Sequence, residues 1–376
     1  MAVEYDSIVC YPPNPGPNWK VEKTSVSRPL NDTELRVRMV ASGICHTDVF
    51  VSCIPDGTPG FQYPRALGHE GGGIVEEVGA GVTVAKVGDP VLLSYNYCDS
   101  CNLCGTSRQP YCDSWPVLNV IGDHTLKTEK GDAVQARFFG QSSFAGESIV
   151  AENSVVNAKD LIKNNDELKL LAPLGCGLMT GSGAVINNAN VRDFDIIVVT
   201  GIGAVGLGAV MAAKIAGAKE IIAVDRIGHR LEIAKELGAT KILESKPDTN
   251  LVEELQKLAG GARIGYVFET TGVIPVIQAA ASALGTRGKL IQIGVPPLGS
   301  ELKLPFYEFF SANKVLDCFY LGDTTGKQWV PKMIQWWREG KFPIEKLVKY
   351  YPVQDALQAL HGMESGVAIK PVIVWE

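Results

Sequence analysis

The sequence has no long apolar run, no block of basic residues and no repeated or low-complexity segment. Its longest apolar stretches, such as Ile196–Val199, are far shorter than the ~20 residues that span a bilayer. The start, MAVEYDSIVC, lacks the basic residues and apolar core of a secretory signal. A formal net charge of −6 argues against nucleic acid or an anionic membrane as a partner. We therefore expect a cytoplasmic protein.

What is present is typical of a soluble globular protein, with 46% hydrophobic and 20% charged residues. A length of 376 residues exceeds one ordinary core, so we expect two domains. Four of the nine cysteines lie between positions 98 and 112. In a reducing compartment, clustered cysteines bind metal more often than they form disulfides.

The first third of the chain is rich in glycine, proline and short β-branched runs. Three of these runs are predicted strands: Leu35–Val40, Gly73–Val78 and Pro90–Ser94. Turn residues separate them, which is typical of a partly open barrel or a sandwich. The segment Asp113–Ala136 has no clear periodicity, and we expect a long surface loop there.

The middle of the chain alternates buried strands with helices. The predicted strands are Asp195–Thr200, Glu220–Asp225, Thr240–Leu243, Gly265–Glu269 and Lys289–Gly294. The predicted helices are Ala204–Ala216, His229–Leu237, Leu251–Leu258 and Pro275–Leu284. This alternation indicates βαβ units and a parallel sheet. After Asp323 it stops, and a helix at Trp329–Arg338 and a strand at Lys370–Trp375 are expected to return to the first domain.

A glycine-rich turn, Gly201–Gly206, follows one of these strands and opens a helix. Gly201 allows the tight turn, Gly203 lets the backbone approach a pyrophosphate, and Gly206 lets helix and strand pack closely. The helix N-terminus offers amides to the phosphates. Asp225 ends the next strand, where it would bind the ribose hydroxyls. The alternative interpretation is that Gly201–Gly206 is a structural turn that binds no cofactor and that Asp225 is a solvated carboxylate.

The carboxylate of Asp225 favours NAD over NADP because it would repel a 2′-phosphate. Arg226 and Arg230 qualify this interpretation, since either could approach that phosphate.

The clustered cysteines are Cys98, Cys101, Cys104 and Cys112. Four thiolates on one short segment can close a tetrahedral zinc shell, which is the mark of a structural site. An iron–sulfur cluster is the competing use, and a group of free buried thiols is the third possibility.

A second set of ligands is scattered along the chain: Cys45 in GICHTD, His69 in GHE and Cys176 in LGCG. Taken separately, Cys45 and Cys176 are better explained as small buried residues and His69 as a core histidine than as metal ligands. Spacing alone does not show that they meet.

At these residues the sequence resembles the zinc-containing medium-chain alcohol dehydrogenases. GHEGGGIVEEVGAGV, the four-cysteine segment, LGCGLMTG, GIGAVG with Asp225, and LIQIGVPP occur in the family's order along essentially the whole chain. The resemblance implies an α/β protein. Residues 1–177 would form a GroES-like, β-rich catalytic domain to which 321–376 return, and 178–320 a Rossmann domain with a doubly wound parallel sheet.

The resemblance also implies roles for individual residues. Cys45, His69 and Cys176 match ligands of a catalytic zinc with an open fourth position. Glu70 and Asp48 match carboxylates that hold those ligands, and Thr47 matches the hydroxyl that takes the alcohol proton. The residues expected at the cofactor are His46, Thr180, Gly201, Gly203, Val205, Gly206, Asp225, Arg226, Arg230, Val295 and Lys370. Among these, His46 and Lys370 would lie on the pyrophosphate and Thr180 against the nicotinamide.

The implied function is a dehydrogenase with two zinc ions and NAD that moves a hydride between a small alcohol and its aldehyde. GICHTD followed by Phe50 is most similar to aryl or benzyl alcohol dehydrogenases. A primary aromatic, allylic or cyclic substrate is therefore expected. The pocket would include Thr47, Ser94 and the surroundings of Phe139, Val295 and Cys318. Small Ser94 would leave room for a ring.

Two alternatives remain open at this point: a glutathione-dependent formaldehyde dehydrogenase and a non-catalytic dinucleotide-binding protein. A zinc-free quinone reductase should lack both the Cys45, His69 and Cys176 set and the four-cysteine segment, and this chain has both. Phe50 stands where many relatives carry a proton-relaying histidine. A homodimer is expected, with Lys289–Val295 as the strand at the junction, and a tetramer is possible.

Overall fold

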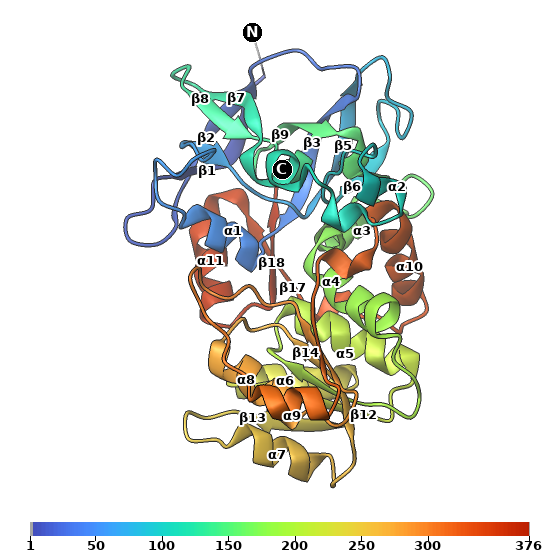
Figure 1. Ribbon diagram of the computed structural model, residues 1–376. Coiled ribbons are helices and arrows are strands. Elements are labelled where there is room, and N and C mark those ends of the chain that lie inside the picture. The colour runs from blue at the N-terminus through green and yellow to red at the C-terminus, as the bar shows by residue number, and fades with distance from the viewer. Residues whose placement is uncertain (1–2, 376) are drawn as a thin grey trace. The chain divides into compact units, whose positions relative to one another are not determined.

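The computed structural model describes residues 3–375, which divide into two compact units (Figure 1). Of the described residues, the first unit contains 3–176, 324–339 and 343–375, and the second contains 177–323 and 340–342. The sequence predicted the boundaries at 177 and 321.

The first unit contains a small closed barrel. Its strands, in order around the barrel, are β1 (Tyr5–Tyr11), β2 (Asn18–Val26), β7 (Asp123–Thr128), β8 (Ala133–Ala136) and β4 (Arg65–Ala66). Val9, Ala66, Leu126 and Val134 belong to one apolar cluster of this barrel. Small and β-branched side chains suit so narrow an interior.

The predicted surface loop at Asp113–Ala136 is wrong. This segment contains a π-helical turn, Val117–Ile121, and the hairpin of β7 and β8. The sequence of β7, DHTLKT, is mostly polar or charged, because a small barrel buries threonines as readily as large apolar residues; Thr125 is fully buried. The hydrophobic alternation that marks a strand is therefore weak.

The second sheet of this unit has the strand order β10-β6-β5-β3-β18-β17, with β9 also paired to β3. Its strands are β3 (Glu34–Gly43), β5 (Gly71–Val78), β6 (Pro90–Leu93), β9 (Glu147–Ala151), β10 (Val155–Asn157), β17 (Val348–Pro352) and β18 (Lys370–Val374). Because β18 pairs with β3 (Val372 opposite Gly43), the C-terminal segment does return to the first unit.

The helices of the first unit are α1 (His46–Ser52), α2 (Asn102–Gly105), α3 (Asn165–Leu171), α10 (Gly326–Arg338) and α11 (Ala356–Glu364). The start of α3 shows how local sequence sets such an end. The side chain of Asn164 accepts a hydrogen bond from the amide of Glu167, which satisfies one donor of the first turn.

The second unit is built on a six-stranded parallel sheet of order β13-β12-β11-β14-β15-β16. In chain order this is 3-2-1-4-5-6, the order of dinucleotide-binding sheets. The strands are β11 (Ile196–Thr200), β12 (Glu220–Asp225), β13 (Lys241–Glu244), β14 (Ile264–Glu269), β15 (Lys289–Gln292) and β16 (Val315–Cys318). The sequence prediction of an α/β Rossmann unit is confirmed: β12 has the predicted bounds, and the ends of the other predicted strands agree within two residues.

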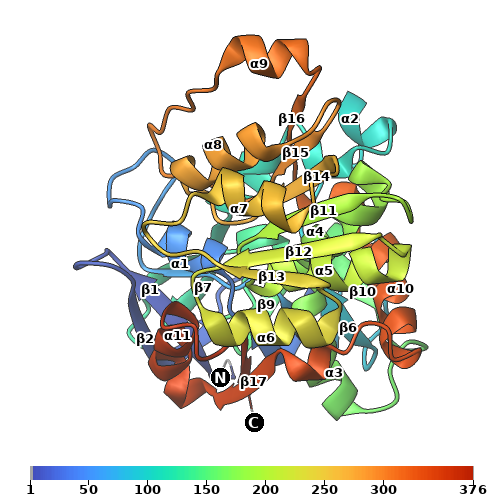
Figure 2. The same ribbon diagram turned by 90° about the horizontal axis from the view of Figure 1, so that it is seen from below.

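Helices cover both faces of this sheet. They are α4 (Gly177–Gly183), α5 (Ala204–Ala216), α6 (Gly228–Leu237), α7 (Leu251–Leu258), α8 (Ile274–Ala283) and α9 (Phe306–Ser311). Figure 2 shows α7 and α8 on one side of the strands and α6 on the other. Leu255 of α7 and Ile277 of α8 pack with Val198 and Leu290 of the sheet in one buried core.

The expected junction strand Lys289–Val295 is not an edge. β15 pairs with β14 on one side and β16 on the other, so the edge strand at this end of the sheet is β16 and the other edge strand is β13. Sequence alone gives no order of strands in a sheet, and a further strand after β15 was not foreseen.

Among residues 3–375, no single helix is long and apolar enough to cross a membrane. One bent pair of consecutive helical segments, Asn165–Gly175 and Gly177–Ala189, passes that test by length and composition only.

Candidate metal centres and cofactor turn

Three loops of the first unit bring the scattered ligands together. Cys45 follows β3 and precedes α1, His69 lies between β4 and β5, and Cys176 follows a short 3-10 turn, Ala172–Gly175. One ligand atom of each, with a carboxylate oxygen of Glu70, lies within 4.8 Å of all the others. His69 and Glu70 are fully buried, and Cys176 is 8% exposed.

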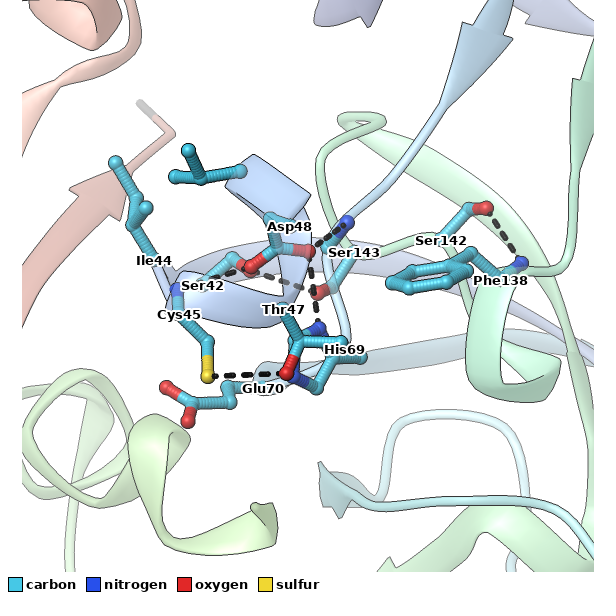
Figure 3. A network of polar contacts seen from close by, with 12 residues as sticks. Ser42, Ile44, Cys45, Thr47, Asp48, His69, Glu70, Phe138, Ser142 and Ser143 are labelled. Atoms are coloured by element: carbon cyan, nitrogen blue, oxygen red, sulfur yellow. Dashed lines mark hydrogen bonds and ion pairs between the residues drawn. The ribbon is translucent and has the colours of Figure 1, made fainter. Parts of the chain in front are cut away.

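Asp48 holds two of these ligands in place (Figure 3). One of its carboxylate oxygens accepts the amide of Cys45 at 2.9 Å. The other lies 2.9 Å from Nδ1 of His69 and accepts the amide of Gly68 at 3.0 Å. Because Nδ1 donates to this carboxylate, the lone pair of the ring is on Nε2.

Nε2 of His69 is buried and has no hydrogen-bond partner among the described residues. An imidazole nitrogen left without a partner in a dry site is unfavourable unless something else binds it. Two thiols face the same point. A Cys₂His set of this kind matches zinc, which prefers nitrogen and sulfur ligands, so the residues present fit the metal.

The same proximity perturbs the titration of the ligands. A hydrogen bond from Cys176 holds the pKa of the Cys45 thiol well below its usual range, while the pKa of Cys176 is raised by that bond and by burial. Burial disfavours the charged form of His69, but the nearby Asp48 outweighs it and raises the histidine pKa. The arrangement of the protein groups therefore favours the thiolate form of Cys45.

Lys370 has a partner in the protein that the sequence analysis did not consider. Its ammonium is 2% exposed and lies 2.9 and 2.8 Å from the two carboxylate oxygens of Glu70. A third bond, 3.2 Å long, goes to the carbonyl of Ile44. Burial raises the pKa of Glu70 to about 7, although Lys370 opposes this. In this structure the lysine therefore compensates Glu70, and its expected contact with the pyrophosphate stays a prediction.

The four clustered cysteines form a second, separate group. Their sulfur atoms all lie within 4.8 Å of one another, with Cys98 and Cys104 at 3.9 Å. The amide of Cys101 donates to the sulfur of Cys98 at 3.3 Å, and the amide of Cys98 to that of Cys112 at 3.4 Å. Four sulfurs with amide donors and no open position fit a structural zinc.

The glycine-rich turn of the second unit has the conformation that its sequence predicts. Gly201 has a φ of +86°, which a side chain would strain. A Cβ at Gly206 would collide with the carbonyl of Gly201, so only glycine lets helix and strand approach. A Cβ at Gly203 would meet no atom within 4 Å and would fill the space before the first turn of α5. A pyrophosphate fits that space.

Asp225 lies at the end of β12, as predicted, and is 9% exposed. Its carboxylate accepts the amides of Ile202 and Ile227 at 2.6 and 2.9 Å. These bonds fix it beside the turn while leaving lone pairs for further donors. Arg226 is exposed and Arg230 is partly buried, with its Nε lacking a hydrogen-bond partner among the described residues. Burial lowers the pKa of Arg230.

The other expected cofactor residues are distributed over both units. His46 is exposed at the start of α1 in the first unit. In the second unit Thr180 is buried on α4, Val205 lies in the first turn of α5, and Val295 is exposed after β15.

The expected pocket residues of the first unit differ in what they do. Thr47 Oγ1 lies 3.8 Å from the Cys45 sulfur. The ring of Phe139 stacks on His69 with centroids 4.5 Å apart. Ser94 is 2% exposed, and its hydroxyl donates to the carbonyl of Gly175 at 2.7 Å, beside Cys176. The sequence analysis used only the small size of this serine and did not predict its hydrogen bond.

Comparison with known proteins agrees with this geometry. The family model of the alcohol dehydrogenase GroES-like domain matches residues 31–166, and that of zinc-binding dehydrogenase matches residues 204–339. A geraniol dehydrogenase of Castellaniella defragrans is 34% identical over 94% of this chain and 94% of its own.

Two further relatives are named for the aromatic alcohol and the glutathione adduct that the sequence analysis considered as substrates. The crystal structure of a benzyl alcohol dehydrogenase from Acinetobacter calcoaceticus has a TM-score of 0.88 and 35% identity over 99% of both chains. A probable S-(hydroxymethyl)glutathione dehydrogenase 1 of Schizosaccharomyces pombe is 31% identical over 90% of this chain and 89% of its own. This chain, with its Cys₂His site, four-cysteine group and dinucleotide-type sheet, belongs to the zinc-binding alcohol dehydrogenase family of oxidoreductases.

Proposed function

We propose that this alcohol dehydrogenase interconverts a primary allylic or aromatic alcohol and its aldehyde with NAD. The observation that carries this proposal is the meeting of the Cys45 and Cys176 sulfurs with the unpartnered Nε2 of His69. Three protein ligands leave a position for substrate, which distinguishes a catalytic zinc from a closed structural one. Relatives named for geraniol and benzyl alcohol support an allylic or aromatic substrate.

The protein groups of this site have separable tasks. Cys45, His69 and Cys176 would hold a zinc, which supplies a Lewis acid for the substrate oxygen when bound. Asp48 keeps the Nε2 lone pair of His69 available. The hydroxyl of Thr47 takes the alcohol proton, and the ring of Phe139, stacked on His69, shields the ligand from water.

The proton taken by Thr47 needs an exit. Phe50 is 41% exposed and can neither donate nor accept a proton, so it cannot act as a relay. Water, or the exposed His46 as the weaker candidate, would carry the proton onward.

NAD is the proposed cofactor, with NADP less suitable. Asp225 presents a fixed carboxylate at the end of β12, where a ribose hydroxyl would be bound and a 2′-phosphate repelled. Replacing Asp225 with Ser is expected to raise the use of NADP relative to NAD. A wild-type enzyme that already strongly prefers NADP would contradict this assignment.

We also propose a second zinc at the four cysteines, a homodimer and a cytoplasmic location. None of the nine cysteines, all of which the structure describes, forms a disulfide, which suits a reducing compartment. For the dimer, β16 offers an unpaired strand edge with half-exposed Val315, next to exposed Phe306 and Phe310 of α9. A second copy of the same strand would satisfy this edge. Light scattering separates a dimer from a monomer or a tetramer.

The direct test measures nicotinamide absorbance with the purified enzyme. Geraniol, benzyl alcohol, a cyclic alcohol and a short aliphatic alcohol are compared, each with NAD and with NADP, and S-(hydroxymethyl)glutathione is included. The allylic and aromatic alcohols should give the highest kcat/KM. A higher value with the glutathione adduct would favour the formaldehyde dehydrogenase alternative, and absence of all turnover would favour a non-catalytic role.

A further inference from the structure

Gln141 is a buried polar residue of the first unit to which neither the sequence patterns nor the proposed chemistry assigns a role. It is fully buried in the loop after the 3-10 turn Phe138–Gly140. Its amide group makes three hydrogen bonds, all to backbone atoms of other segments. Nε2 donates to the carbonyl of His69 at 2.9 Å and to that of Ser94 at 2.8 Å. Oε1 accepts the amide of Gly71 at 3.1 Å.

Ser94 extends this connection to another ligand. Its hydroxyl donates to the carbonyl of Gly175, directly before Cys176. Gly175 has no space for a side chain, because a Cβ there would collide with the carbonyl of Leu93. The backbone of His69 and the backbone next to Cys176 are therefore joined through two side chains, Gln141 and Ser94, although 106 residues separate the two ligands in the sequence.

The loop that carries Gln141 is itself held in an unusual conformation. Arg137, Phe139 and Ser142 have φ values of +62°, +53° and +49°, which side chains other than glycine rarely adopt. Such a conformation persists only where surrounding contacts impose it. The hydroxyl of Ser142 supplies one of these, donating to the carbonyl of Ala66 at 2.7 Å. The side-chain amide of Gln141 makes three more hydrogen bonds that hold this loop.

We propose that Gln141 and Ser94 are positioning residues that set the separation of His69 and Cys176. On the other side of His69, Asp48 already joins that residue to Cys45. The three ligands are thus fixed in pairs by two sets of hydrogen bonds: the carboxylate of Asp48, and the amide of Gln141 with the hydroxyl of Ser94. The inference rests on the proposed function, since it assigns a metal to this site.

The test is the substitution Gln141→Met, which keeps the length of the side chain and removes both donors and the acceptor. The matched control is Gln135→Met. Gln135 is also a buried glutamine of this unit, 4% exposed, but its Oε1 accepts the amide of Gln62, which lies outside the three loops that carry the ligands. Both variants lose buried hydrogen bonds, so both are expected to unfold at lower temperature than the wild type.

The decisive measurement is zinc retention against a competing chelator, read as zinc ions per folded chain. Partners that orient metal ligands typically change metal affinity by about 10- to 100-fold, and we expect a loss of this size at the Cys₂His site only in Gln141→Met. Zinc at the four cysteines should be retained equally in both variants. Equal zinc loss in Gln135→Met, or no loss in Gln141→Met, would overturn the inference.

A second variant keeps the inference testable if Gln141→Met does not fold. Ser94→Ala removes a single hydroxyl, so it should lower zinc affinity less than Gln141→Met does. Combined, the two changes should lower affinity less than the product of their separate effects, because they act on one connection. If the double variant loses zinc affinity by the full product of the two separate effects, the two residues do not act on one connection, and the inference is overturned. A wild-type chain that holds no zinc at this site would instead overturn the proposed function itself.

Discussion

The two candidate metal sites of the first unit differ in where their ligands come from along the chain. The four-cysteine group draws all its ligands from residues 98–112, so closing it requires little beyond the local chain. The Cys₂His group draws Cys45, His69 and Cys176 from three distant loops, and its geometry depends on the whole unit. One site can help to fold the chain around it, whereas the other exists only after the chain has folded.

Their surroundings differ accordingly. The cysteine group is stabilised by its own backbone amides, such as Cys101 to Cys98. The Cys₂His group is stabilised by buried side chains that are not ligands, among them Asp48 and Lys370. A site that must bind and release substrate cannot rely on saturated coordination, so other groups have to fix its ligands.

The largest effect is expected on activity from Cys176→Ser. A serine cannot supply the soft thiolate that the site needs, so turnover should fall by more than about 1,000-fold. The fold should persist, because the loops around Cys176 keep their hydrogen bonds. Steady-state kinetics and a thermal unfolding curve check the two parts. A collapse of stability in this variant would contradict the distinction drawn between the sites.

The converse change is Cys104→Ser in the cysteine group. Closed zinc sites contribute folding free energy, so the unfolding midpoint should fall by about 5–10 °C. Activity at low temperature should suffer less than in Cys176→Ser. Calorimetry with metal analysis measures this. Unchanged stability after loss of the metal would show that the group does not serve as a structural site.

An intermediate effect is expected from Asp48→Asn. The amide would place a donor against one of the N–H groups that the carboxylate now accepts, those of Cys45, Gly68 and His69. Zinc affinity at the scattered site should fall by about 10- to 100-fold. The four-cysteine site of the same molecule is the internal control. Equal loss at both sites would point to general destabilisation instead.

The smallest effect is expected from Phe50→His, which adds a titratable group on α1, the helix that also carries Thr47 and Asp48. A general base contributes about 100- to 10,000-fold where it is well placed, but this one is not held by any partner. A modest gain in alcohol oxidation near neutral pH, seen in the pH profile of kcat, would support a missing relay. If the profile does not move and Thr47→Ala is also harmless, the proton leaves by another path.

Local patterns allowed most of the second unit to be predicted. The GIGAVG turn, its flanking strands and Asp225 are contiguous features, and buried parallel strands leave a clear apolar signal. The edge strand β16 was missed because most of its residues are exposed, so it lacks the apolar signal of a buried strand. In the first unit β7 was missed because its buried residues include threonines.

The scattered metal site could not be derived from spacing. Cys45, His69 and Cys176 were grouped through the family resemblance, and the structure brings their ligand atoms together. Gln141 had no signal at all. Its partners His69 and Ser94 lie 72 and 47 residues away, and the interaction is with backbone carbonyls, which every residue has. A sequence cannot show which carbonyls a glutamine will meet.

The place of β18 in its sheet has a consequence for the order in which the chain folds. β18 lies between β3 and β17, and it carries Lys370, the counter-ion of Glu70. During synthesis, residues 177–323 contain all six strands of the second unit's sheet and can form it as soon as they emerge. The first unit begins earlier but stays open until residues 370–374 are available, so the part made first finishes last. Until then the Glu70 carboxylate lacks its cation, and the Cys₂His site cannot reach its final electrostatic state.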